Sequence, residues 1–284
     1  MKKNITTFGE ILWDIFPDKE ILGGAPLNFA YFSAKRGMEA SIISAVGCDK
    51  LGKSAIETAL SHNINCDAVS VDDLHNTGVV NVELASNGSA KYTFPDNSAW
   101  DYIPLLDVAL EKAKDSHAFV FGTLAQRSTT SQNTLRHLLN QIPQDCTVIF
   151  DINLRQNFYT KSIVEYSLNS ADILKINDDE LVCLKEMLRL EGAENSLCET
   201  VLSKYKLKYL ILTLGARGYK IFSDTEYLED KPIAVEIADT VGAGDAFTAT
   251  FVSDILNGIP AREAANNANE IASLVCSRRG AFCL

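Results

Sequence analysis

The sequence predicts one α/β domain, in which helices cover a mostly parallel sheet and a small β insertion projects from it. Predicted strands and helices alternate from the N-terminus to about residue 62, and the alternation resumes after Trp100. A helix between successive strands is typical of a parallel sheet, because parallel neighbours need a crossover connection. Between Val69 and Phe94 the pattern changes to short segments of alternating polarity, which indicates half-exposed antiparallel strands.

In the first part of the chain, glycine and proline separate the predicted elements. Proline is favoured in the first turn of a helix and glycine just after its end, which suits Pro26 and Gly37. The elements expected here are a strand at Ile5–Leu12 that continues to a turn at Pro17-Asp18, a helix from Gly23-Gly24-Ala25-Pro26 to about Arg36, a strand at Ser41–Val46 and a helix at Leu51–His62.

The β insertion is predicted to contain a hairpin. Its strands are Gly78–Leu84 and Ala90–Phe94, and Ser86-Asn87-Gly88-Ser89 joins them with a strong turn signal. Together with about residues 12–23, the insertion of about residues 69–103 would form a small antiparallel sheet that lies over the main body as a lid. Since no flexible linker or internal repeat interrupts the chain, residues 1–284 are expected to form a single domain.

After Trp100, strands and helices are again predicted in alternation up to a pair of closing edge strands. The strands expected here are His117–Phe121, Thr147–Asp151, Ile173–Ile176 and Tyr209–Leu214, followed by the edge strands Tyr219–Phe222 and Ala234–Ile237, and the last two helices are Ala243–Asn257 and Ala261–Ser277.

Composition and charge exclude several classes of partner. The chain has 284 residues and a formal net charge of −11, which argues against binding to nucleic acid or to an anionic membrane. No apolar run has the length of a membrane span, and Glu10 and Asp14 interrupt the apolar stretch that follows Met1-Lys2-Lys3, so a secretion signal is not expected. The seven cysteines are scattered without metal-ligand spacing, which favours a reducing cytoplasm.

The strongest functional signal is a glycine turn near the C-terminus, Asp239-Thr240-Val241-Gly242-Ala243-Gly244-Asp245-Ala246-Phe247. A glycine turn that begins a helix leaves backbone N–H groups free at the positive end of the helix dipole, where an anion such as phosphate can bind. Asp245 would repel a bound phosphate, but it could accept the proton of a group that attacks that phosphate.

A second candidate phosphate site lies at Gly47-Cys48-Asp49-Lys50-Leu51-Gly52-Lys53-Ser54, which matches the pattern G-x-x-x-x-G-K-[ST]. Thr147–Asp151, an apolar strand that ends in an acid, could be its magnesium-side partner, so a P-loop NTPase is an alternative. Two facts weaken it. Asp49 would place a carboxylate in a loop that should surround phosphate oxygens, and the match leaves the C-terminal glycine turn and the β insertion unexplained.

Taken together, these motifs resemble the ribokinase-like (PfkB) family of sugar kinases. The turn at 239–247 resembles the C-terminal signature of the family. Gly23-Gly24-Ala25-Pro26-Leu27-Asn28, followed by Gly47-Cys48-Asp49-Lys50-Leu51-Gly52, resembles its N-terminal signature and accounts for the P-loop match. The resemblance runs from Gly9 to Gly280 and implies a three-layer α/β/α ribokinase-like fold with a β lid.

Within the family, four segments look most like bacterial fructokinases. They are Gly9-Glu10-Ile11-Leu12-Trp13-Asp14, Asn97-Ser98-Ala99-Trp100-Asp101, Phe121-Gly122-Thr123-Leu124-Ala125-Gln126-Arg127 and Asp151-Ile152-Asn153-Leu154-Arg155. The resemblance therefore implies an ATP-dependent, magnesium-requiring kinase that phosphorylates a primary hydroxyl of a sugar, with fructose as the expected acceptor.

The resemblance also implies roles for residues around the acceptor. Asp245 would be the base for the attacking hydroxyl, and the amides of Gly242, Ala243 and Gly244 would form the anion hole. Other acceptor-binding residues would be Asp14, Asn28 and Arg155, with Gly23 and Gly24 allowing close approach of the backbone.

For the nucleotide, the resemblance implies Asn177, Thr213, Gly215, Gly218 and Asn269. Asn177-Asp178-Asp179-Glu180 matches the N-x-x-E motif, in which Glu180 organises Mg²⁺ through water. Asp239 and the backbone of Val241 lie where many members bind a monovalent cation such as K⁺. Only four residues follow Gly280, fewer than is usual in the family, which leaves dependence on that cation open.

Three further matters stay open on the sequence alone. The acceptor could instead be ribose, 2-keto-3-deoxygluconate, a nucleoside or a sugar phosphate, and Arg127 and Arg155 are the obvious basic residues for a phosphorylated one. A sugar-binding regulator on the same scaffold is a non-enzymatic alternative, although it would be expected to lose Asp245. The exposed strands of the lid are expected to pair with a second copy, giving a homodimer.

Overall fold

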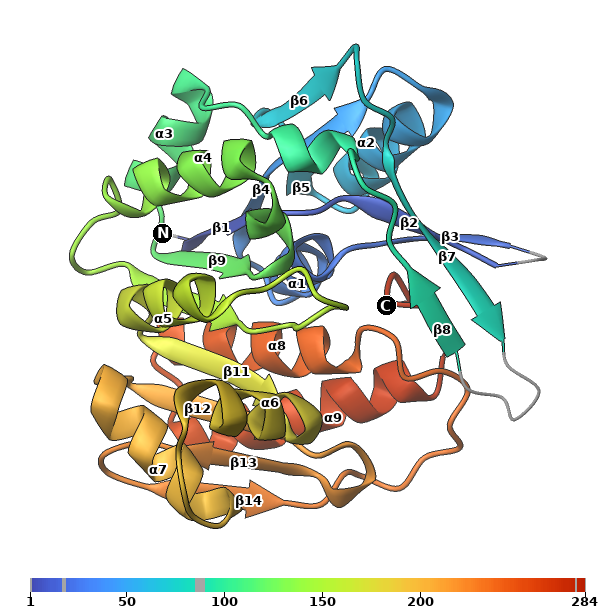
Figure 1. The fold of residues 1–284 in the computed structure, drawn as a ribbon. Coiled ribbons are helices and arrows are strands. Elements are labelled where there is room, and N and C mark those ends of the chain that lie inside the picture. The colour runs from blue at the N-terminus through green and yellow to red at the C-terminus, as the bar shows by residue number, and fades with distance from the viewer. Residues whose placement is uncertain (1, 17–18, 85–89, 279, 284) are drawn as a thin grey trace.

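A computed structural model of the protein describes residues 2–16, 19–84, 90–278 and 280–283. It contains a central sheet with helices on both faces and a second, smaller sheet at one side (Figure 1). No helix within the described ranges is long and apolar enough to cross a membrane. The expected turns at Pro17-Asp18 and Ser86–Ser89 both lie outside the described residues.

The central sheet has the order β14-β13-β12-β11-β10-β9-β1-β4-β5, and β6 pairs with β4. All neighbours are parallel except β12–β13 and β13–β14. Its strands are β1 (Asn4–Phe8), β4 (Glu39–Gly47), β5 (Ile64–Asn65), β6 (Val69–Asp72), β9 (Ala118–Gly122), β10 (Thr147–Asp151), β11 (Ile173–Asn177), β12 (Tyr209–Thr213), β13 (Tyr219–Phe222) and β14 (Tyr227–Asp230).

Helices form a layer on each face of this sheet. Because side chains alternate along a strand, Phe119 and Phe121 pack with the helices of one face, while Ala118 and Val120 pack with those of the other. The first face carries α3 (Asp107–Lys114), α4 (Thr129–Leu139), α5 (Lys161–Ser170), α6 (Asp178–Leu188) and α7 (Glu194–Tyr205), and the second carries α1 (Ala25–Lys35), α2 (Lys50–Ser61), α8 (Ala243–Leu256) and α9 (Ala261–Cys276). The predicted three-layer α/β/α fold is confirmed.

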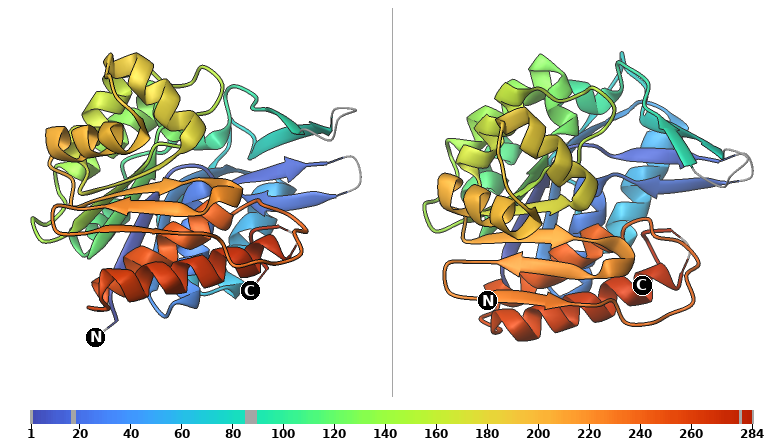
Figure 2. Two further views of the ribbon diagram at one scale, coloured as in Figure 1. Left: turned by 90° about the horizontal axis from the view of Figure 1, so that it is seen from below. Right: turned by 60° about the horizontal axis from the view of Figure 1, so that its bottom comes forward.

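The smaller sheet has the order β3-β2-β7-β8 and is called the lid below (Figures 1 and 2). Its strands are β2 (Leu12–Ile15), β3 (Glu20–Gly23), β7 (Gly78–Leu84) and β8 (Ala90–Thr93). The two hairpins β2–β3 and β7–β8 are antiparallel as predicted, and they join through parallel pairing of β2 with β7.

The expected insertion of about 69–103 is wider than this sheet. Val69–Asp72 pairs with β4 in the central sheet, and Ala99–Tyr102 forms a 3₁₀ turn that buries Trp100 in the core. The lid sheet therefore takes only Gly78–Thr93 from the insertion.

Two predicted strands are wrong. The strand expected from Ile5 to Leu12 and onward is divided, because β1 ends at Phe8 in the central sheet and β2 begins at Leu12 in the lid. The second error is an edge strand. Ala234–Ile237 lies outside the sheet, and the preceding Tyr227–Asp230 forms the edge strand instead. A short turn, in which the amide of Ser223 donates to the carbonyl of Glu226 (3.1 Å), folds β14 directly back on β13. The following segment then runs along α9, where the amide of Ile233 donates to the Ser273 hydroxyl at 3.2 Å.

Candidate active site

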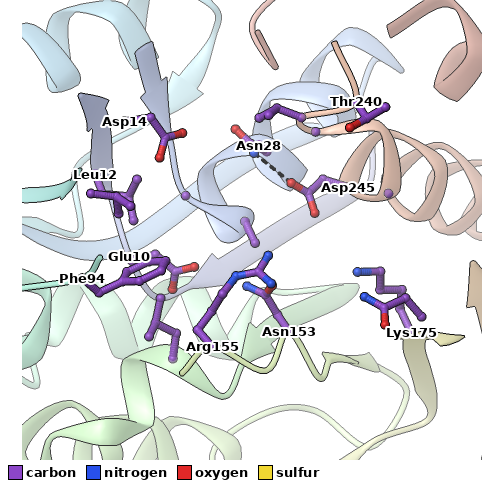
Figure 3. Close-up of a pocket in the computed structure, with 18 of the residues that line it drawn as sticks. Glu10, Leu12, Asp14, Asn28, Phe94, Asn153, Arg155, Lys175, Thr240 and Asp245 are labelled. Carbon is purple, nitrogen blue, oxygen red and sulfur yellow. Dashed lines mark hydrogen bonds between the residues drawn. The ribbon is translucent and has the colours of Figure 1, made fainter. Parts of the chain in front are cut away.

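A cavity of about 390 Å³ lies between the lid and the carboxyl ends of the central strands. In open parallel sheets this edge is where ligands bind, because the loops that follow the strands meet there. The lid contributes Leu12 and Asp14, α1 contributes Asn28, and the N-terminus of α8 contributes Gly244 and Asp245 (Figure 3). The structure thus brings together residues that are more than 200 positions apart in the sequence.

Helix α8 begins at the cavity with an uncapped N-terminus. Gly242 is its N-cap with φ 79°, and no side chain caps the helix. A Cβ on Gly242 would lie 2.6 Å from the Cβ of Ala281, so this position requires glycine for its space as well as its backbone. Gly242 and Gly244 line the cavity, whereas the amide of Ala243 donates to the carbonyl of Thr240 at 3.3 Å.

Asp245 lies in the first turn of α8 and faces the cavity. Its Oδ2 accepts a hydrogen bond of 2.8 Å from Nδ2 of Asn28, across the junction of α1 and α8. Removal from bulk water, reinforced by the Asp151 carboxylate, raises the pKa of Asp245 to about 6, while Lys175, Asn28 and Arg155 act in the opposite direction. A carboxylate with this pKa is a competent proton acceptor at neutral pH.

Of the other predicted acceptor residues, Asp14, Gly24, Asn28 and Arg155 line the same cavity, whereas Gly23 is outside its lining. Asn28 is 5% exposed, and its buried Oδ1 has no hydrogen-bond partner among the residues that the structure describes, so it is available to a donor in the cavity. Burial raises the pKa of Asp14 to about 6, with Arg155 opposing and Asp239 adding to the rise. Gly23 lies against Asp14, since a Cβ there would be 3.3 Å from Asp14 Oδ2.

Lys175 is a site residue that sequence reasoning missed. It lies in β11 and forms a buried ion pair with Asp151 of β10, with 3.1 Å between Nζ and Oδ1. Although burial acts to lower it, the carboxylates of Asp151, Glu180 and Asp245 raise the pKa of Lys175, so the ammonium stays charged. A Cβ on Gly244 would lie 3.6 Å from this Nζ, which places the charge beside the N-terminus of α8. The signal in the sequence was a lysine inside an otherwise apolar strand.

The two arginines have different surroundings. Arg155 reaches the cavity from the loop after β10, and no ion pair within 4 Å involves it in the described part of the chain (Figure 3). Arg127 is instead buried in an ion pair with Asp101, with two contacts of 2.7 Å, and stacks over Trp100. Arg127 therefore supports the core and is not a residue of the cavity.

The residues predicted for the nucleotide fall into two groups. Asn177 and Thr213 line the cavity. Gly218 and Asn269 lie outside its lining and meet at Lys231: a Cβ on Gly218 would be 2.8 Å from the Lys231 Cα, and the side chain of Asn269 donates to the Lys231 carbonyl at 2.8 Å. Gly215 begins the 3₁₀ turn that leads to Gly218, with open space around it.

The residues predicted for metals hold neighbouring loops in place. Glu180 is buried, and its two carboxylate oxygens accept hydrogen bonds from the amides of Leu154 (3.1 Å) and Asn177 (2.9 Å). Asp239 accepts from the amides of Val241 (3.0 Å) and Gly280 (3.1 Å). Among the residues that the structure describes, no three His, Cys, Asp or Glu side chains form a cluster that could hold a metal by themselves.

The P-loop alternative does not fit the structure. Asp49 caps α2, and its carboxylate accepts hydrogen bonds from the amides of Gly52 and Thr77 and from the Thr77 hydroxyl, at 2.7 to 2.8 Å. Although partial burial opposes them, these bonds lower the pKa of Asp49, so the loop carries its own anion. The Lys53 side chain is 77% exposed and points to Glu57, and no residue of Gly47–Ser54 lines the cavity.

The pfkB family carbohydrate kinase profile matches residues 15–282. The chain belongs to this family of kinases. It is 27% identical over 298 residues to a sugar kinase of Pyrococcus horikoshii, covering 98% of this chain and 91% of that protein. It is 25% identical to the fructokinase of Salmonella typhimurium, covering 92% and 87%.

Solved structures agree with the fold of this kinase. The crystal structure of the Pyrococcus horikoshii protein in complex with ATP superimposes with a TM-score of 0.86 at 26% identity, covering 98% of this chain and 94% of that one. The fructokinase of Vibrio cholerae in its fructose, ADP and calcium form has a TM-score of 0.82 at 21% identity, covering 99% and 94%, and shows the shared fold. The predicted family and the predicted ribokinase-like fold are both confirmed.

Proposed function

We propose that this sugar kinase transfers the γ-phosphoryl group of ATP to a primary hydroxyl of fructose. The observation that carries the proposal is Asp245, a carboxylate in the first turn of an uncapped helix, held by Asn28 and opposed across the cavity by Asp14. The names of several relatives, which are fructokinases of Salmonella typhimurium and Arabidopsis thaliana, support fructose as the acceptor.

The acceptor binds among groups that suit a neutral polyol. The Asp14 carboxylate and the partnerless Oδ1 of Asn28 accept hydrogen bonds from hydroxyls, and Arg155 donates to ring or hydroxyl oxygens. The cavity presents the carboxyl groups of Glu10, Asp14 and Asp245 against two cations, Arg155 and a Lys175 that is paired with Asp151. Negative charges would repel an acceptor that already carries a phosphate, and Arg127 is committed to Asp101. We therefore favour an unphosphorylated sugar.

Phosphoryl transfer then needs a base and a positive field. Asp245 accepts the proton of the attacking hydroxyl as its oxygen bonds to the γ-phosphorus, and the bond to the β-phosphate oxygen breaks, leaving ADP. The amides of Gly242 and Gly244 and the Lys175 ammonium lie where they stabilise charge on the transferred group. The predicted contribution of the Ala243 amide would require it to leave the Thr240 carbonyl.

Two metal ions belong to the proposal. Magnesium bound with the nucleotide would neutralise phosphate charge, and Glu180, whose oxygens already accept backbone amides, suits contact through water ligands better than direct coordination. Asp239 and the Val241 carbonyl would supply oxygen ligands to K⁺. Activity that is equal in K⁺ and in a bulky organic cation would remove the second ion from the proposal.

The nucleotide is proposed to extend from Asn177 and Thr213 toward Gly215, Gly218 and Asn269. The first pair lines the cavity, and Gly218 and Asn269 meet at Lys231, which gives a continuous path along the carboxyl end of β12. Replacement of Asn269 by leucine should raise the KM for ATP and leave the KM for the sugar unchanged.

The acceptor is tested by a coupled assay of ADP release with ATP and magnesium. The panel contains fructose, ribose, 2-keto-3-deoxygluconate, a nucleoside and fructose 6-phosphate. The proposal expects the highest kcat/KM with fructose, and product NMR should place the phosphate on a primary hydroxyl. Preference for another sugar would change the proposed acceptor and leave the proposed kinase activity standing. Sugar binding without any turnover would instead point to a non-catalytic regulator.

Assembly and location complete the proposal. The lid sheet ends in the edge strands β3 and β8, and an unpaired edge invites pairing with a second copy, so we propose a homodimer through the lid. Light scattering at micromolar concentration should then give twice the chain mass of 31.1 kDa, and a monomer would contradict it. All seven cysteines are free, which supports a cytoplasmic location.

A further inference from the structure

Glu10 occupies the crossing between the two sheets. It lies between the end of β1 in the central sheet and the start of β2 in the lid, and only 3% of it is exposed. Its side chain nevertheless lines the cavity, beside Phe94 and facing Arg155 (Figure 3). Burial of a carboxyl group costs free energy because it removes the hydration of that group, unless hydrogen bonds from the protein or from a ligand replace it.

The backbone of Glu10 is fixed against the beginning of α1. A Cβ on Gly24, which has φ 111°, would lie only 2.3 Å from the Glu10 carbonyl oxygen, so the two segments approach as closely as glycine allows. Gly9, with φ 144°, packs in the same way against Pro26. These two close contacts fix the backbone on both sides of the Glu10 Cα, from which its side chain extends to the cavity.

The Glu10 carboxyl group keeps capacity for a ligand. In the described part of the chain, no side chain forms an ion pair within 4 Å or a hydrogen bond with it. Burial raises its pKa to about 7 and Asp245 adds to the rise, whereas the amides of Glu10 and Ala25 and the charge of Arg155 lower it. Asp14 and Lys175 are the other charged groups that line the same cavity.

We propose that Glu10 is a specificity-determining residue that accepts a hydrogen bond from a sugar hydroxyl other than the one that is phosphorylated. Figure 3 shows Glu10, Asp14 and Asp245 at three corners of the cavity, so a sugar between them meets a carboxyl group at three separate positions. This inference rests on the proposed function, since it assigns one more contact to the same acceptor.

Three carboxyl groups at fixed corners can select the arrangement of hydroxyls. Each carboxyl group forms its strongest hydrogen bond with a donor that approaches in a straight line, and a sugar that lacks the matching hydroxyl leaves that buried group one hydrogen bond short. Glu10 is therefore expected to reject deoxy acceptors at one ring position. Arg155, which lies beside it, limits the charge that collects in the cavity when Glu10 is ionised.

The test combines the Glu10→Gln variant with deoxy analogues of the sugar that the wild-type enzyme phosphorylates best. Glutamine has nearly the same size, so the variant changes charge and hydrogen bonding with little loss of packing. For one analogue, the wild-type enzyme should lose about 10- to 100-fold in kcat/KM, which is the usual worth of a hydrogen bond to a charged group. The variant should lose less than about threefold with that same analogue.

Two further readouts distinguish binding from a merely structural role. Glu10→Gln should raise the KM for the sugar and leave the KM for ATP unchanged. In the wild-type enzyme, kcat/KM for the sugar should rise as pH increases through about 7, where Glu10 becomes ionised, and this inflection should vanish in the variant. Glu57→Gln is the matched control, because the Glu57 side chain is exposed on α2, pairs with Lys53 and does not line the cavity.

The outcomes separate the two proposals. If wild type and Glu10→Gln discriminate every deoxy analogue equally, or if the KM values for sugar and ATP rise together, Glu10 does not contact the acceptor. If the wild-type enzyme phosphorylates no sugar at all, the proposed function fails first. Glu10→Asp keeps the carboxylate on a side chain that is one methylene shorter. Unlike Glu10→Gln, it should show the pH inflection, but its KM for the sugar should stay raised.

Discussion

Helices α2 and α8 both begin with a glycine-containing turn that could bind phosphate, and the structure gives them different roles. At α2, the Asp49 carboxylate occupies the turn and accepts the amides of Gly52 and Thr77. At α8, Gly242 provides no side chain to cap the helix, and the turn faces the cavity. The N-terminus of α2 is therefore capped by the carboxylate of its own Asp49, whereas the N-terminus of α8 could accept an anion from solution.

The comparison shows that a phosphate site is defined by amides that remain available. At the N-terminus of α2 the hydrogen-bond donors already have a protein acceptor, since the Thr77 hydroxyl also donates to the Asp49 carboxylate. Around α8, Lys175 adds a positive charge, and Asp245 adds the carboxylate that we propose as the base.

The largest effect is expected from Asp245→Asn. Asparagine keeps the size and can still contact Asn28, but it cannot accept the hydroxyl proton. We expect kcat to fall by about 10²- to 10⁴-fold, which is the usual contribution of a general base. The measurement is the steady-state rate of ADP release at pH 7.5, with circular dichroism to show that the fold is kept. A variant with more than a tenth of wild-type kcat would exclude Asp245 as the base.

Loss of the charge beside α8 should have the next largest effect. Lys175→Met removes the ammonium near Gly244, and we expect kcat to fall by about 10²-fold, as when one transition-state donor is lost. Lys53→Met is the matched control at α2, because its side chain is exposed and lies outside the cavity. Equal losses in the two variants would contradict the contrast between the helices. Lys175→Met should also lower stability, since Asp151 would be left buried without its partner.

The pH dependence of turnover should follow the ionisation of Asp245. Its pKa is raised to about 6, and only the ionised form accepts a proton. Below the inflection near pH 7 that is expected from Glu10, kcat/KM for the sugar should fall further as pH decreases through about 6. Asp245 alone gives a limiting slope of about tenfold per pH unit, and the slope is steeper where Glu10 or Asp14 must also be ionised. Rates measured from pH 5 to 8 at constant ionic strength test this. A flat profile across pH 6 would mean that the proton goes elsewhere.

The smallest catalytic effect is expected at the capped helix. Asp49→Ala removes the cap of α2, and we expect a loss of about 1 to 2 kcal/mol in the free energy of unfolding. The kcat of the folded variant should change less than about twofold, because Asp49 does not line the cavity. Chemical denaturation and the coupled assay give the two numbers. A large loss of kcat with normal stability would restore the α2 turn as a functional element.

Much of the fold could be predicted because local patterns determine it. The strand limits of β10 and β13 match the prediction, and α8 begins at the predicted Ala243. The prediction of the edge strand failed because Tyr227–Asp230 and Ala234–Ile237 are both short segments that could pair with β13. The short turn at Ser223–Glu226 places Tyr227–Asp230 beside β13, so this segment forms the strand. Turn geometry of this kind depends on the sheet already being in place.

The site divides in the same way. Asp245 and Asn28 belong to recognisable motifs, and their hydrogen bond agrees with a shared role. Lys175 belongs to no motif, and Glu10 lies in the fructokinase-like segment Gly9–Asp14 without a role of its own being assigned there. Lys175 can be recognised as a site residue only once the parallel register sets Asp151 opposite it. Glu10 can be recognised only once its position between the two sheets is known. Such pairings depend on strand order, which a single sequence does not specify.

The central claim is that the α8 turn, and not the α2 turn, receives the phosphates. The most direct measurement is an NMR spectrum of protein labelled with ¹⁵N-glycine, recorded as a non-hydrolysable ATP analogue, magnesium and fructose are added. We predict that the amide signals of Gly242 and Gly244 move far more than those of Gly47 and Gly52. Large shifts at Gly47 and Gly52 with unmoved signals at Gly242 and Gly244 would contradict the account.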